Sequence, residues 1–280
     1  MQLRLLRLEL KTRPCATRLP FRFGISTMTE AQMLIGTLEV ATESGRAIGY
    51  SGELLVPKWF AKNPASSIED DNSDLIRSVR AAFDAMQANG DSTAFGHWLA
   101  AQTRCVESAG DTTPRLVAMF GVSFVERALI DAACRAAGTS FARGLEDDLF
   151  GIRLGAIEPR LDGWTGQDLG RPSASVRVRH TVGLVDALEP DEVDASQRLG
   201  DDHPLSLVDD IAAYGLDCFK LKVSGNAEAD LHRLETIARL TPESASFTVD
   251  GNEQYGDPGE LADVLDELDR RGSAGAILSG

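Results

Sequence analysis

The N-terminal part of the chain alternates hydrophobic and polar residues with the two-residue period of half-buried strands. Residues 2–10 show this alternation, and residues 32–42 and 47–55 are two further strand candidates. Ser44 and Gly45, which separate the last two, are typical turn residues. Because so short a turn joins antiparallel neighbours, we expect a three-stranded meander at the start of the chain.

The hydrophobic period then becomes helical. A first helix is expected from Ser67 until the stop signal Asn89-Gly90, and a second over residues 123–137. Strands followed by helices are the order of an α+β domain, which we place at residues 1–140.

The C-terminal part, residues 176–280, alternates strands with helices. It follows a connection at residues 141–175 that is rich in glycine and proline and low in periodicity. Strands are expected at residues 176–182, 218–223, 246–250 and 274–278, and helices at 205–214, 227–240 and 258–271. A strand about every thirty residues predicts parallel βαβ units, which build either a doubly wound sheet or a barrel.

Composition and charge mainly exclude classes of function and location. The 43 acidic and 28 basic residues give a net charge of −15, which repels phosphates, so we expect no nucleic-acid partner. The N-terminus lacks the apolar core of a signal peptide, and no apolar run approaches the ~20 residues that cross a bilayer. The four cysteines form no Cys-x-x-Cys pair. We therefore expect a cytoplasmic protein with reduced thiols and no membrane partner.

Glycine-rich phosphate loops and the Gly-x-Ser-x-Gly elbow are absent from the sequence. Nucleotide-binding and serine-hydrolase functions therefore lose their usual support.

Two lysines on one predicted strand are candidate catalytic residues. Lys220 and Lys222 are two positions apart, so they point to the same face of the strand. A strand between helices is buried on both faces, where lysine is costly unless it is used. Neighbouring ammonium groups disfavour each other's charged form, which favours a lysine base near neutral pH. The alternative is that both lysines lie past the strand end and extend into water.

Polar residues also occur at the ends of the neighbouring strands. Asp250 ends one of them and could hold a hard cation such as Mg²⁺, while the amide of Asn252 could contact a ligand. The alternative is that Asp-Gly-Asn is simply a turn. The hydroxyl of Thr181 could bind a substrate carboxylate, although threonine is also a common strand residue.

Other charged residues on the predicted helices are expected on solvated faces. These are the acids between residues 263 and 269, and Asp230, His232 and Arg233.

The order of these features resembles the enolase superfamily, in its mandelate racemase / muconate lactonizing enzyme branch. Residues 1–60 look like the meander of the family's capping domain, and residues 124–133 like the helix that closes it. Residues 218–223 match the second-strand Lys-x-Lys, and residues 249–252 match the third-strand Asp-x-Asn. The resemblance implies an α+β capping domain followed by a (β/α) barrel of which about three to four βα units are present.

The resemblance also implies a mechanism. In that family Mg²⁺ binds the substrate carboxylate and stabilises an enediolate after a proton is taken from the α-carbon. By this likeness Lys222 is the acid/base, Lys220 tunes it, and Asp250 is the first metal ligand. Asn252 and Thr181 would contact the substrate or lie just behind it.

Substrate specificity in the family comes largely from loops of the cap. The corresponding loops here are residues 22–27 and 53–60, with Phe23, Leu54 and Trp59 as candidate substrate-binding residues.

The sequence departs from the family pattern at its C-terminal end. The family has two further acidic ligands on later strands, whereas no acidic residue follows Asp269 here. We therefore expect the N-terminal portion of a homo-oligomeric racemase, epimerase or cycloisomerase that acts on a small carboxylate. The alternatives are a non-catalytic half-barrel that binds partners and dimerises, and a doubly wound α/β enzyme with its lysines at a switch point.

Overall fold

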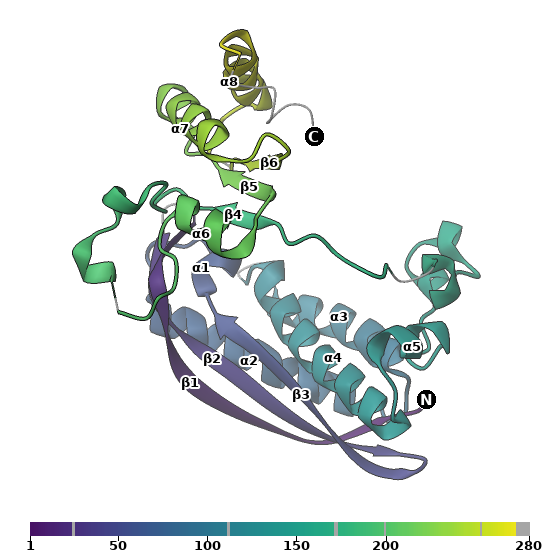
Figure 1. Ribbon diagram of the computed structural model, residues 1–280. Coiled ribbons are helices and arrows are strands. Elements are labelled where there is room, and N and C mark those ends of the chain that lie inside the picture. Colours follow the sequence, from purple (N-terminus) through teal and green to yellow (C-terminus); the bar gives the residue numbers. More distant parts are fainter. Residues whose placement is uncertain (24–25, 111–112, 171–172, 199, 253, 273–280) are drawn as a thin grey trace. The chain divides into compact units, whose positions relative to one another are not determined.

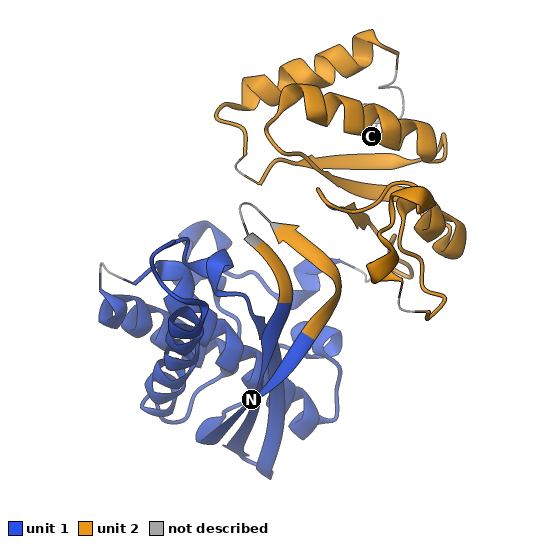
Figure 2. Ribbon diagram, turned by 90° about the vertical axis from the view of Figure 1, so that its left-hand side faces the viewer, with its two compact units in different colours: residues 1–15, 30–172 blue, residues 16–29, 173–280 orange. Residues whose placement is uncertain are grey.

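The protein divides into two compact units. The computed structural model describes residues 1–23, 26–110, 113–170, 173–198, 200–252 and 254–272 (Figure 1). The first unit comprises Met1–Cys15 and Glu30–Pro172, and the second Ala16–Thr29 and Ser173–Gly280 (Figure 2). The end of the β1–β2 hairpin therefore groups with the C-terminal residues.

The sheet of the first unit has the order β1-β2-β3. Its strands are β1 (Arg4–Phe23), β2 (Ser26–Thr42) and β3 (Gly45–Leu55). Strands β2 and β3 are antiparallel, with Thr42 opposite Gly45 at the turn, as the alternating pattern predicted. The buried residues Leu34, Leu38 and Val40 lie at even spacings on the face that packs against the helices.

Helices cover one face of this sheet (Figure 1). The helices of the first unit are α1 (Pro57–Phe60), α2 (Ile68–Gln87), α3 (Ala94–Ala109), α4 (Arg115–Ala137) and α5 (Phe141–Glu146), followed by 3₁₀ turns at Leu154–Ala156, Pro159–Leu161 and Gly166–Leu169. The Ser67 hydroxyl accepts a hydrogen bond from the Asp70 amide at 3.0 Å and caps α2. No helix among the described residues is long and apolar enough to cross a membrane.

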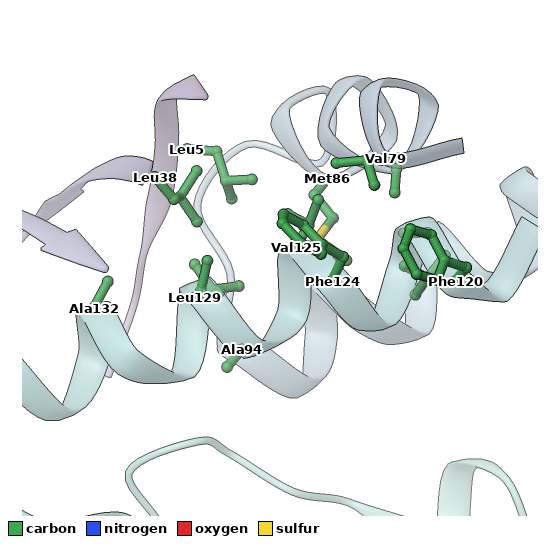
Figure 3. Packing of buried hydrophobic residues seen from close by; sticks show 14 of the residues in the cluster. Leu5, Leu38, Val79, Met86, Ala94, Phe120, Phe124, Val125, Leu129 and Ala132 are labelled. Carbon is green, nitrogen blue, oxygen red and sulfur yellow. The ribbon is translucent and has the colours of Figure 1, made fainter. Parts of the chain in front are cut away.

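The core of the first unit centres on α4 (Figure 3). Phe124, Val125 and Leu129 of this helix are fully buried. They pack among residues from the sheet, α2 and α3, which include Leu5, Leu38, Val79, Met86 and Ala94. The first turns of α4 are continuously apolar from Leu116 to Val122, so they lack the one-sided stripe by which helices are detected. The sequence pattern accordingly placed its start at residue 123 instead of Arg115, which was wrong.

Helix α3 was missed altogether by the hydrophobic pattern. Its buried face consists of Ala94, His97, Ala101 and Cys105, which repeat at helical spacing but are small or polar. Buried His97 donates from Nε2 to the carbonyl oxygen of Leu3 at 2.9 Å, so a polar residue occupies a core position. A hydrophobicity pattern cannot detect such a face.

Helix α4 packs tightly against α2 at Gly121. A Cβ atom on Gly121 would lie 2.1 Å from the backbone oxygen of Ser78, so Gly121→Ala must push the helices apart. Such overpacking costs about 1–3 kcal/mol, whereas the better helix propensity of alanine returns at most about 1 kcal/mol. We expect the substitution to lower the free energy of unfolding, measured by urea denaturation. The control Gly52→Ala, whose Cβ would have no neighbour closer than 3.8 Å, should not; equal stability of both variants would contradict this packing.

The second unit contains parallel strands that alternate with helices. In chain order it has β4 (His180–Val182), 3₁₀ turns at Pro190–Glu192 and Ala195–Gln197, α6 (Leu207–Tyr214), β5 (Cys218–Lys222), α7 (Ala227–Leu240), β6 (Ser246–Asp250) and α8 (Pro258–Arg270). The sheet order is β4-β5-β6, and both pairs are parallel, as predicted. The strand expected at residues 274–278 lies outside the described residues.

Strand β4 is shorter than the strand predicted at residues 176–182. Its partner β5 begins only at Cys218, and His180 already pairs with Phe219. Residues 176–178 therefore lie beyond the start of β5 and have no strand to pair with on that side. Val176 and Val178 are 86% and 71% exposed, so their β-forming side chains mark no strand here.

Candidate functional site

Candidate catalytic residues meet at the carboxyl ends of β5 and β6. The register of the two parallel strands places Lys222 opposite Asp250. On β5, Phe219 and Leu221 are fully buried, while the alternate positions Lys220 and Lys222 share the other face. The strand period thus brings both lysines to the edge of the sheet where parallel strands present functional groups.

The carboxylate of Asp250 joins these side chains into one cluster. Its Oδ2 atom lies 2.7 Å from Nζ of Lys220 and 2.7 Å from Nζ of Lys222. Lys222 also donates a hydrogen bond to Oδ1 of Asn252. The Lys222 side chain is only 5% exposed and that of Lys220 27%. The alternative that both lysines extend into water is therefore wrong.

Asp250 also makes the turn that the sequence allowed as an alternative. Its Oδ1 accepts a hydrogen bond from the Asn252 amide at 3.0 Å. Asn252 has a φ of 45°, in the left-handed region that asparagine tolerates better than most residues. The turn uses Oδ1 of Asp250 and the ion pairs use Oδ2. Asp250 is therefore both a turn residue and a member of the lysine cluster.

The charges in the cluster keep Asp250 ionised. Burial disfavours its charged form, but hydrogen bonds from Lys220 and Lys222 outweigh burial and lower the pKa of Asp250 to about 2. The carboxylate also offsets the repulsion between ammonium groups that the lysine spacing alone suggested. With both lysines protonated, the three groups carry one net positive charge, which suits an anionic ligand.

Thr181 lies beside this cluster on the adjacent strand. It pairs with Lys220 across β4 and β5, and Lys220 pairs in turn with Thr248 on β6. The structure therefore brings Thr181 into the same row of strand ends as the lysines.

The other predicted substrate-binding residues lie on the long hairpin and in the first unit. Phe23 is the last residue of β1, and its side chain is outside the described part. Leu54 belongs to β3, and Trp59 belongs to the short helix α1 and is 48% exposed. The two expected loops are thus mainly regular structure: residues 22–27 include the ends of β1 and β2, and residues 53–60 the end of β3 and α1.

Lys58 is a residue of the first unit that sequence reasoning missed. Its Nζ lies 2.6 Å from Oδ2 of buried Asp71 and also donates to the carbonyl oxygens of Asn63 and Ser66. The ammonium group therefore ties α1, with Trp59, to the start of α2. No local pattern distinguishes Lys58 from a surface lysine.

The cluster contains one carboxylate, that of Asp250, that could bind a magnesium ion. Carboxylate oxygens are preferred ligands of Mg²⁺, and Asp250 supplies one carboxylate, already paired with both lysines. The described residues contain no group of three or more His, Cys, Asp or Glu side chains that could hold a metal. These residues thus fit as one ligand and do not by themselves form a metal site.

Two charged residues of α7 contradict the solvated face that the sequence predicted. Asp230 is 3% exposed, and Arg233 is largely buried. Both contact loops that follow the strands instead of water. The first-turn position of Asp230 does not mark it as buried, because Glu228 shares that position and is exposed.

Solved structures of several enzymes share this fold. No protein-family model matches the sequence, and no curated protein is significantly similar to it. A mandelate racemase/muconate lactonizing enzyme-like protein from Rubrobacter xylanophilus is 20% identical; the match covers 97% of this chain and 58% of that protein, with a TM-score of 0.58. A dipeptide epimerase from Cytophaga hutchinsonii, complexed with Mg and the dipeptide D-Ala-L-Val, is 15% identical over 96% of this chain and 57% of its own, with a TM-score of 0.55. A 2-chloromuconate cycloisomerase from Rhodococcus opacus is 15% identical over 98% of this chain and 58% of its own, with a TM-score of 0.58.

The likeness to these structures is one of fold. It confirms, at that level, the resemblance indicated by the cap pattern and the Lys-x-Lys and Asp-x-Asn motifs. The chain spans 57% to 58% of the length of these three proteins.

Proposed function

We propose that this chain forms the capping domain and first barrel strands of an enolase-superfamily enzyme. The enzyme would take the α-proton of a small carboxylate substrate, in a racemase, epimerase or cycloisomerase reaction. The observation that carries the proposal is the cluster of Lys220, Lys222, Asp250 and Asn252 at adjacent strand ends. A fold shared with an epimerase and a cycloisomerase supports it.

The geometry suggests a role for each lysine. Lys222 is buried, and Asp250 and Asn252 hold its Nζ, so a neutral Lys222 would present its lone pair at a fixed point for the α-proton. Lys220 is more exposed, and its ammonium group would attract the substrate carboxylate. Thr181, next to Lys220 in register, would add a hydroxyl to the same carboxylate site.

We further propose Asp250 as one oxygen ligand of Mg²⁺, with the remaining ligands supplied from outside the described residues. When bound, the ion would lower the cost of negative charge on the substrate. Leu54, Trp59 and Phe23 remain proposed specificity residues of the cap.

Exchange of the α-proton with solvent tests the proposal without knowledge of the full reaction. The full-length protein is incubated in D₂O with Mg²⁺ and a panel of dipeptides, N-acyl amino acids and α-hydroxy acids, and the α-proton signals are followed by NMR. We expect at least one carboxylate to lose its α-proton signal, and chelation of Mg²⁺ to stop the loss. A folded protein that exchanges none of the panel would contradict the proposed function.

A further inference from the structure

Asp230 is a buried acid that binds two of the loops at the strand ends. It lies in the first turn of α7 and is 3% exposed. Its carboxylate accepts hydrogen bonds from the amide and hydroxyl of Ser224, both at 2.8 Å, and from the amide of Gly225 at 3.0 Å. It also accepts one from the Tyr255 hydroxyl at 2.7 Å. A buried carboxylate is costly unless its oxygens are satisfied, and here donors from two loops satisfy them.

These donors stand close in sequence to the catalytic candidates. Ser224 follows Lys222 by two residues in the loop after β5. Tyr255 follows Asn252 by three in the loop after β6. Asp230 therefore connects the loop that follows Lys222 to the loop that follows Asp250 and Asn252, which accept the hydrogen bonds of Lys222.

The two loops also pack against each other without spare room. A Cβ atom on Gly225 would lie 2.4 Å from the backbone oxygen of Gln254. Gln254 donates from its side chain to the carbonyl oxygen of Asn252 at 3.1 Å. A shift of either loop would therefore move Asn252 relative to Lys222.

Arg233, one helical turn after Asp230, holds the loop that follows β4. Its Nη2 donates to the carbonyl oxygens of Gly183 at 2.7 Å and Asp186 at 2.9 Å. That loop begins just after β4, which carries Thr181. One face of α7 thus contacts the loops after β4, β5 and β6.

We propose that Asp230, together with Tyr255, is a positioning residue that fixes Lys222 against Asp250 and Asn252. Arg233 holds the loop after β4 in place through its hydrogen bonds to Gly183 and Asp186. The geometric part concerns only residues of this chain. The kinetic consequence rests on the proposed function.

Kinetics of α-proton exchange in the full-length enzyme test the consequence. Tyr255→Phe removes one hydroxyl and Asp230→Asn removes one charge, while Glu228→Gln changes an exposed residue of the same helix. We expect the first two to lower kcat by about 10- to 100-fold with KM nearly unchanged, as for loss of groups that orient catalytic residues. Glu228→Gln should leave both constants unchanged. The double variant should be no slower than Asp230→Asn, because both changes break one connection.

An NMR measurement tests the geometry without any substrate. In protein labelled with ¹⁵N-lysine, the Nζ signal of Lys222 is assigned by its loss in Lys222→Met. We expect this signal to shift or exchange faster with water in Tyr255→Phe and Asp230→Asn, and to stay in place in Glu228→Gln. Tyr255→Phe keeps the test decisive if Asp230→Asn fails to fold.

The outcomes separate this inference from the proposed function. An unchanged Lys222 signal in folded Tyr255→Phe protein would overturn the positioning role, whatever the activity. A shifted signal in a protein whose wild type exchanges no α-proton would uphold the positioning role and remove the proposed function.

Discussion

Replacement of Lys222 by methionine in the full-length protein is expected to abolish α-proton exchange. A positioned general base contributes about 10²–10⁴-fold to a rate, and no other described side chain is held by both Asp250 and Asn252 as Lys222 is. Methionine has a similar length and no proton to exchange, so it fills the buried position without replacing the base. The rate of deuterium incorporation into the best substrate of the panel measures the loss.

Loss of the base can be separated from loss of the fold. Lys220 remains paired with Asp250 in Lys222→Met, so the carboxylate keeps one charged partner and the variant should stay folded. Lys11→Met removes a lysine that is 74% exposed and should leave exchange unchanged. Exchange at the wild-type rate in folded Lys222→Met protein would refute the catalytic role.

The sequence predicted this cluster because its geometry follows from local rules. A two-residue spacing places Lys220 and Lys222 on one strand face, and parallel strands in sequential order bring their carboxyl ends together. Asp250 ends the next strand, so its proximity to Lys222 required only the correct order of strands. The ion pairs themselves follow from that register.

The sequence could not predict which residues hold the lysine cluster in place, because these contacts join elements that are separate in the chain. Asp230 has the pattern of a solvated helix residue, and only the meeting of two loops at its carboxylate makes it a core residue. The length of β4 depends on where its partner strand begins, which no local pattern of residues 176–179 contains. The buried face of α3 likewise could not be predicted, because its residues are small or polar and are buried only by neighbouring elements.

Glu126 of α4 makes the stability of the protein depend on pH. Burial raises the pKa of this carboxyl from 4.5 to about 7, and the positive charge of neighbouring Arg127 only partly opposes the shift. The folded state therefore holds a proton on Glu126 that the unfolded state has already lost between pH 4.5 and 7. Its contribution to stability is complete below about pH 4.5, and it is lost as the pH rises through about 7.

Glu126→Gln should accordingly stabilise the protein at high pH and have little effect at low pH. Glutamine keeps the size of the protonated side chain and cannot ionise, so it removes the cost of burying a charge. We expect the free energy of unfolding to rise by roughly 1–3 kcal/mol at pH 8 and to change little at pH 4.5, as measured by urea denaturation. The exposed residue Glu107 of α3 provides the control Glu107→Gln, expected to change stability by less than about 0.5 kcal/mol at both pH values.

The difference between the two pH values is the decisive quantity in this experiment. Other groups, such as the buried His97, whose pKa burial lowers, also make stability depend on pH, but their effect is the same in both proteins and cancels. A gain of equal size at pH 4.5 and pH 8 would mean that glutamine packs better for reasons unrelated to charge. A gain confined to high pH would mean that α4, the central helix of the first unit, carries a carboxyl group that the fold keeps protonated near neutrality.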